Sequence, residues 1–92
     1  MENGAANGDN GGGRILVVED EAHLAAGLKL NFELEGYRVD VATTSRDAMA
    51  AMVDGSFDVI LLDVQLPDMN GYELCRRLRQ AGNHTPVIIR AE

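Results

Sequence analysis

Two short apolar runs, each followed at once by acidic residues, constrain this chain more than any other feature. The first run covers residues 14–18 and precedes the acids Glu19 to Glu21, and the second covers residues 57–62 and ends at Asp63. Apolar runs without alternation are typical of strands buried on both faces, as in a parallel sheet. We therefore predict two buried strands whose carboxyl ends carry carboxylate groups.

The segments around these runs predict further strands and helices in strict alternation. Apolar residues spaced four apart indicate helices, glycine marks helix ends, and a hydroxyl residue is a typical helix cap. After the first strand we predict a helix ending before Gly36, a strand at 37–42, a helix from Thr44 or Ser45 to Asp54, the strand at 57–62, a helix at 72–80 and a strand at 86–89. The order βαβαβαβ favours an α/β fold with a parallel sheet and helices on both faces.

Length and composition set limits on the class of protein. Ninety-two residues allow one small domain, which we place at 14–92 behind a flexible Gly/Asn-rich tail at 1–13. The net charge of −7 argues against a direct nucleic-acid partner. The sequence has neither a membrane-spanning run nor a secretory leader, and Cys75, its single cysteine, is expected to be a buried or half-buried thiol in a helix. A cytoplasmic protein without a membrane partner is expected.

The acidic strand ends predict a cation site. Ligands of open parallel sheets bind at the carboxyl ends of the strands, so Glu19, Asp20 and Asp63 crowd together if their strands are neighbours. Like charges about 4 Å apart repel by about 4 kcal/mol at an effective dielectric near 20, which a proton or a cation must offset. Carboxylates suit a hard ion such as Mg²⁺. A carboxylate beside Mg²⁺ can attack phosphorus and form an acyl phosphate. The alternative is purely structural, because a single acid at a strand end is usually a turn residue.

Three motifs resemble the receiver domain of bacterial two-component response regulators. They are ILVVEDE at 15–21, DVILLD at 58–63 and LPDMNG at 66–71, and the resemblance extends from about Arg14 to Ile89. It implies a flavodoxin-like, three-layer α/β/α fold whose complete form has the strand order 2-1-3-4-5.

The resemblance also implies roles for individual residues. Asp63 is expected to be the phosphoacceptor, supplied by a sensor histidine kinase or a phosphotransfer protein in a phosphorelay. Mg²⁺ is expected to bind Asp20 and Asp63 directly, Glu19 mainly through water, and the backbone carbonyl of Gln65. Glu21 is expected to cap the first helix instead. The family is not an enzyme in the usual sense, because it catalyses only its own phosphorylation and dephosphorylation.

The chain also departs from the family that it resembles. The fifth strand and the last two helices are missing, so we expect an incomplete receiver whose exposed fourth strand offers an edge for self-association. A possible output domain is expected to be missing from this chain as well. The position that the family gives to a phosphate-binding hydroxyl falls on Ala91 or is missing altogether, and Lys29 is the only lysine, far upstream of the site. No residue downstream of Asp63 is expected to replace the family's lysine, so phosphorylation should be impaired.

Other functions remain open at this stage. The missing lysine and hydroxyl favour a receiver-like binding module that is not phosphorylated, or an inactive fragment. A small Mg²⁺-dependent phosphatase with Asp63 as nucleophile is disfavoured, because Gln65 stands where such enzymes usually carry a second acid. His23 and His84 are expected to be surface residues and not phosphohistidines.

Overall fold

Strands and helices alternate along the whole described part of the chain. The computed structural model describes residues 12–91, so the tail predicted for 1–13 lies almost wholly outside the described residues. The elements are β2 (Arg14–Val18), α2 (Ala22–Leu34), β3 (Arg38–Ala42), α3 (Ser45–Asp54), β4 (Val59–Asp63), α4 (Gly71–Gln80) and β5 (Val87–Arg90). The predicted order βαβαβαβ is confirmed, with element ends shifted by one or two residues.

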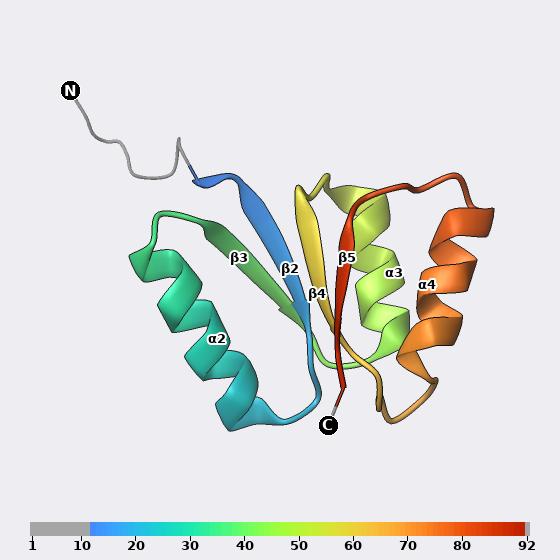
Figure 1. Ribbon diagram of the computed structural model, residues 1–92, viewed down its shortest axis with the longest axis horizontal. Coiled ribbons are helices and arrows are strands. Elements are labelled where there is room, and N and C mark those ends of the chain that lie inside the picture. The colour runs from blue at the N-terminus through green and yellow to red at the C-terminus, as the bar shows by residue number, and fades with distance from the viewer. Residues whose placement is uncertain (1–11, 92) are drawn as a thin grey trace.

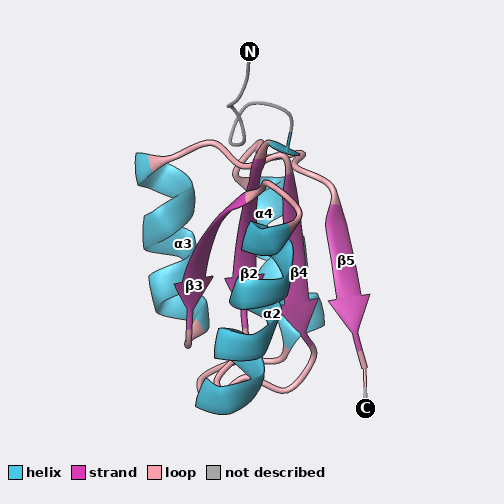
Figure 2. Ribbon diagram, turned by 90° about the vertical axis from the view of Figure 1, so that its left-hand side faces the viewer, coloured by secondary structure: helices cyan, strands magenta, loops and turns pink. Residues whose placement is uncertain are grey.

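The four strands form one parallel sheet in the order β3-β2-β4-β5. All four arrows point the same way in Figure 2, and Figure 1 shows α2 on one side of the sheet and α3 and α4 on the other. This is the predicted flavodoxin-like three-layer arrangement. In the central register, Val18 lies beside Ala42 on β3 and beside Leu62 on β4. The carboxyl ends of β2 and β4 therefore meet at the same edge of the sheet.

The apolar core is divided between the two faces of the sheet. The larger cluster lies under α3 and α4, where Leu16, Leu62 and Leu74 are fully buried. The smaller cluster lies under α2 and contains Ile15, Val17 and Val39, with Leu28 and Phe32 packed against it. Because β2 contributes to both clusters, its continuous apolar run is buried on both faces, as predicted.

The face under α2 is the less completely covered one. Val39 is buried, but Val41, which alternation along β3 places on the same side, is 38% exposed, and Ile88 on the edge strand β5 is 59% exposed. Between residues 12 and 91, α2 is the one helix on this face, and a single helix cannot cover four strands. Self-association through β5 stays a prediction.

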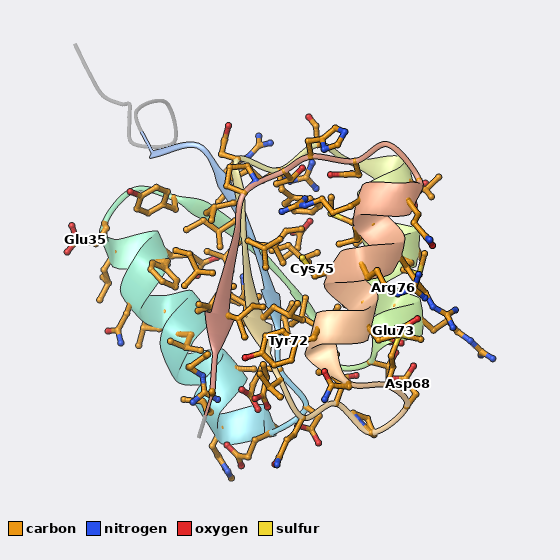
Figure 3. All side chains as sticks on the ribbon, turned by 45° about the vertical axis from the view of Figure 1, so that its right-hand side comes forward. Glu35, Asp68, Tyr72, Glu73, Cys75 and Arg76 are labelled. Carbon is orange, nitrogen blue, oxygen red and sulfur yellow. The ribbon has the colours of Figure 1, made fainter. Side chains whose placement is uncertain are left out.

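Helix α4 places its apolar side against the larger cluster. Leu74 and Leu78 are buried, and the half-buried Cys75 agrees with the expected role of its thiol. Figure 3 shows Cys75 on the side toward the sheet and Glu73 and Arg76 together on the outer side. Hydrogen bonds from Arg76, then from Arg77, lower the pKa of Glu73 to about 2. The outer side of α4 is thus a charged, solvent-facing surface.

Side-chain caps fix the ends of the helices that flank the strand tips. Glu21 accepts a hydrogen bond from the Leu24 backbone N–H at 2.6 Å, so its predicted role as the cap of α2 is confirmed. Of the two residues predicted to cap α3, Thr44 does so, accepting from the backbone N–H of Asp47. Such caps satisfy helix N–H groups that have no partner within the helix.

The carboxylate of Asp68 connects α3 to the loop between β4 and α4. Asp68 lies in that loop, before α4 (Figure 3), and accepts hydrogen bonds from the backbone N–H of Ser45 at 2.9 Å and of Arg46 at 3.2 Å. It also accepts one from the Ser45 hydroxyl at 2.7 Å, and Ser45 is only 2% exposed. The loop that follows Asp63 is therefore held against the first turn of α3.

The Asp68 contacts predict a pH-dependent contribution to stability. Hydrogen bonds from the Ser45 backbone and then from its hydroxyl hold the pKa of Asp68 below its ordinary value of 3.8. Because the folded state binds this proton more weakly than the unfolded state, ionised Asp68 stabilises the fold above that pH. The stability advantage of wild type over Asp68→Asn should therefore shrink as the pH falls from neutrality to about 3, measured by urea unfolding. An advantage that is constant over this range would contradict the assignment.

Candidate functional site

Three acidic side chains meet at the carboxyl ends of the two central strands. Glu19 and Asp20 directly follow β2, and Asp63 is the last residue of β4, its hydrogen-bonded neighbour. One carboxylate oxygen from each of the three lies within 4.8 Å of the others, and this group is the one potential metal cluster found among residues 12–91. The predicted convergence of these acids is confirmed, while their chemical roles stay a prediction.

The three acids differ in their access to solvent and in their hydrogen bonds. Glu19 is 3% exposed, and its Oε2 accepts a hydrogen bond from the Glu21 backbone N–H at 3.0 Å. Asp63 is 7% exposed, and its Oδ1 accepts a long hydrogen bond of 3.4 Å from the Gln65 N–H. Asp20 is exposed. Two carboxylates are thus held in place by the backbone, and the third faces the solvent from which a cation would arrive.

The loop after β4 forms one wall of an open pocket around these acids. Gln65, Leu66 and Pro67 line the pocket together with the acidic residues, and an isolated bridge between Gln65 and Asn70 closes the loop. The start of α4 lies close behind, because the Gly71 N–H donates to the Val64 carbonyl at 2.6 Å. The loop therefore has a fixed, narrow shape and brings the Gln65 backbone to the pocket.

Gly71 is needed for this close approach of α4 to the phosphoacceptor candidate. A Cβ atom at this position would lie 2.5 Å from the Asp63 carbonyl oxygen and 3.0 Å from the Val64 Cα. Both are backbone atoms, which cannot turn away as a flexible side chain can. The close backbone contacts explain why a glycine stands at the first residue of α4.

Arg90 is a residue of the pocket that the sequence analysis missed. Its Nη2 donates to Glu19 Oε1 at 2.5 Å, across strand β4, and Arg90 lines the pocket with the three acids. The register of β5 places the Arg90 backbone beside Asp63. The expectation that no residue downstream of Asp63 replaces the family's lysine stays a prediction, because the pairing of Arg90 with Glu19 does not test it. The position of Arg90, one residue beyond the apolar run that ends at Ile89, was the signal in the sequence for a cation at this end of the sheet.

The other candidate residues lie away from the acidic cluster. Lys29 donates to Glu33 at 2.6 Å and to the Val39 carbonyl at 3.3 Å, both outside the pocket. His23 is fully exposed at the start of α2, 3.8 Å from a Glu21 oxygen, and His84 is exposed in a loop. The surface positions expected for both histidines are confirmed.

The donor set of the pocket fits a hard divalent cation. Four carboxylates line the pocket, the three of the cluster and that of Glu21, against one side-chain cation, Arg90, so negative charge predominates. Carboxylate and carbonyl oxygens are the ligands that Mg²⁺ prefers, and it usually keeps several waters, which an open pocket allows. The exposed Asp20 and the backbone-held Asp63 and Glu19 offer such oxygens from two adjacent strands.

Comparison with known proteins identifies the family. The model of the response regulator receiver domain matches residues 15–91, so the chain belongs to the receiver family of two-component response regulators. None of the helices described within residues 12–91 has the length and apolar character needed to cross a bilayer.

Individual relatives agree with this assignment. Transcriptional regulatory protein TcrA of Mycobacterium tuberculosis is 44% identical over 86 residues, which are 94% of this chain and 34% of TcrA. The uncharacterized transcriptional regulatory protein YkoG of Bacillus subtilis is 43% identical over 77 residues, 84% of this chain and 34% of YkoG. The chain thus spans about a third of the length of these curated relatives.

Solved structures show the same fold. The receiver domain of the Francisella response regulator 1452 superimposes with a TM-score of 0.83 at 32% identity, covering 86% of this chain and 65% of that one. Response regulator TrrA of Thermotoga maritima, solved in complex with Mg²⁺-BeF, gives a TM-score of 0.79 at 31% identity, covering 85% of this chain and 68% of TrrA.

Proposed function

We propose that this chain is a phosphoacceptor receiver of a two-component phosphorelay and carries the phosphoryl group on Asp63. The observation that supports this most directly is the convergence of Glu19, Asp20 and Asp63 within 4.8 Å at the tips of adjacent strands. Of the two acids in this group that the sheet and its loops hold nearly buried, Asp63 is the one at the end of β4 beside the loop that forms the pocket wall. Its carboxylate is the proposed nucleophile.

The proposed cofactor is Mg²⁺, with Asp20 and Asp63 as direct ligands. Glu19 acts mainly through water, and Gln65 contributes its backbone carbonyl. When bound, the metal ion neutralises charge on the transferred group. Support comes from the oxygen-rich pocket and from the relative TrrA, which was solved with Mg²⁺-BeF.

The proposed reaction is a phosphoryl transfer to a carboxylate. An oxygen of Asp63 attacks the phosphorus atom, a new phosphorus–oxygen bond forms, and the bond between phosphorus and the donor atom breaks. The donor nitrogen of a phosphohistidine leaves with the electron pair of that bond. The backbone N–H of Gln65, 3.4 Å from Asp63 Oδ1, helps to orient the carboxylate.

The proposed donor is a sensor histidine kinase or a phosphotransfer protein, because receiver domains of response regulators partner with histidine kinases. The curated relatives are named as transcriptional regulators, so an output domain that acts on transcription is the proposed downstream element of a longer protein. A cytoplasmic location goes with this proposal.

Dependence on the divalent cation tests the proposal. The chain is incubated with acetyl phosphate with and without Mg²⁺, and the gain of one phosphoryl group is measured by intact mass spectrometry. We expect labelling with Mg²⁺ and a loss of most of it after chelation or in Asp20→Asn. Asp54→Asn is the matched control, because Asp54 is an exposed aspartate outside the pocket and should leave labelling unchanged. An extent of labelling that does not change after chelation of Mg²⁺ would contradict the proposed role of the metal.

A further inference from the structure

The ion pair between Arg90 and Glu19 occupies the same carboxylate that the proposed metal site needs. Arg90 Nη2 lies 2.5 Å from Glu19 Oε1, and the backbone N–H of Glu21 lies 3.0 Å from Oε2. Both oxygens of this carboxylate therefore already accept hydrogen bonds. Because Glu19 is only 3% exposed, water alone cannot solvate its charge, and the guanidinium compensates much of the cost of burying it.

We propose that Arg90 is an internal counter-ion that competes with the divalent cation for the acidic cluster and so sets the affinity of the site. This inference rests on the proposed function, because it concerns the cation that supports phosphorylation of Asp63. In the metal-free protein, the guanidinium neutralises Glu19. A divalent cation whose bound water hydrogen-bonds to Glu19 must share that carboxylate with Arg90 or displace the guanidinium from it.

The position of Arg90 suits such an exchange. It lies at the end of the edge strand β5, and its side chain is 31% exposed, so the guanidinium can turn toward water without crossing the core. The Glu19 side chain, in contrast, is 4% exposed and cannot follow it. The exposed Asp20 gives an arriving cation a first ligand on the solvent side of the pocket. The carboxylates thus stay in place while the arginine moves.

The direction in which the Mg²⁺ affinity changes when Arg90 is removed separates this proposal from a merely structural role. If Arg90 only fastened β5 to β2, its removal would loosen the pocket and weaken binding of the cation. If it competes, its removal takes a positive charge away from a dication a few ångströms distant and frees one Glu19 oxygen. The loss of this Coulomb repulsion over a few ångströms predicts an affinity gain of roughly tenfold in a solvent-exposed pocket.

Titration with Mg²⁺ alone, followed by two-dimensional amide NMR of the full chain, tests the proposal. We expect Arg90→Gln to bind Mg²⁺ roughly tenfold more tightly than wild type, and Arg90→Lys to bind within about twofold of it. Lys29→Gln is the matched control, because it removes the same charge outside the pocket and should not change the affinity. Dispersed spectra before titration show that each variant is folded.

Each result decides between the possibilities. Equal or weaker binding by a folded Arg90→Gln chain overturns the proposal, and so does a tenfold gain in Lys29→Gln, which would indicate an effect of net charge. If Arg90→Gln fails to fold, Arg90→Met takes its place, because it keeps an apolar stem without the charge; competition predicts the same gain of roughly tenfold, and a structural role predicts none. Binding by neither wild type nor variant would refute the metal site itself. A tenfold gain without phosphoryl transfer to Asp63 would leave the counter-ion role intact and refute the proposed function.

Discussion

An Asp63→Asn chain is expected to lose the phosphoryl label completely, to the background of a sample without donor. The amide nitrogen and oxygen of asparagine are far weaker nucleophiles than a carboxylate, and an acyl phosphate cannot form at this side chain. The substitution keeps the size of the side chain and leaves an oxygen to accept from the Gln65 N–H. The effect on labelling should therefore be chemical, with little loss of fold. Intact mass spectrometry after incubation with acetyl phosphate and Mg²⁺ measures it.

Asp54→Asn is the matched control for this experiment. Asp54 is an exposed aspartate at the end of α3, and it lines a separate pocket together with Arg14 at the start of β2. It should retain the full extent of labelling. A label that persists in Asp63→Asn, or one that disappears in Asp54→Asn, would place the phosphoacceptor elsewhere.

A Leu62→Ala chain is expected to be destabilised by about 2–5 kcal/mol. Leu62 is fully buried in the central strand β4 and belongs to the larger core cluster, so its truncation leaves a cavity as well as losing apolar burial. A whole domain is stable by only about 5–15 kcal/mol, which makes this a large fraction of the total. Urea unfolding followed by circular dichroism should show a lower midpoint, or no folded baseline at all.

The same substitution at Leu34 provides the comparison. Leu34 is the last residue of α2 and is 74% exposed, so Leu34→Ala should change the free energy of unfolding by no more than about 0.5 kcal/mol. Similar losses at the two positions would show that the core on the α3 and α4 side contributes less than its burial indicates.

The sequence predicted the fold and the acidic cluster because both follow from local patterns. A continuous apolar run indicates a strand buried on both faces, and parallel neighbours necessarily bring their carboxyl ends to one edge. Once β2 and β4 were recognised, Glu19, Asp20 and Asp63 had to lie close together, and they do. The strand order and the Glu21 cap of α2 followed from the same local and family-level patterns.

Contacts between residues distant in sequence were harder to predict. Arg90 and Glu19 are 71 positions apart, and Asp68 and Ser45 are 23 apart. An arginine after an apolar run has many possible partners, and only the register of β5 beside β4 directs this one to the pocket. The exposure of Val41 depends in the same way on how far α2 extends over the sheet, which alternation along one strand does not encode.

The attachment of Asp68 to Ser45 has a mechanical consequence. The segment that passes from Asp63 to α4 is fastened at its midpoint to the first turn of a different helix, so the two behave as one body. A displacement of that segment must either carry the start of α3 along or break these contacts. A movement of the loop that follows the tip of β4 would therefore be transmitted to the start of α3.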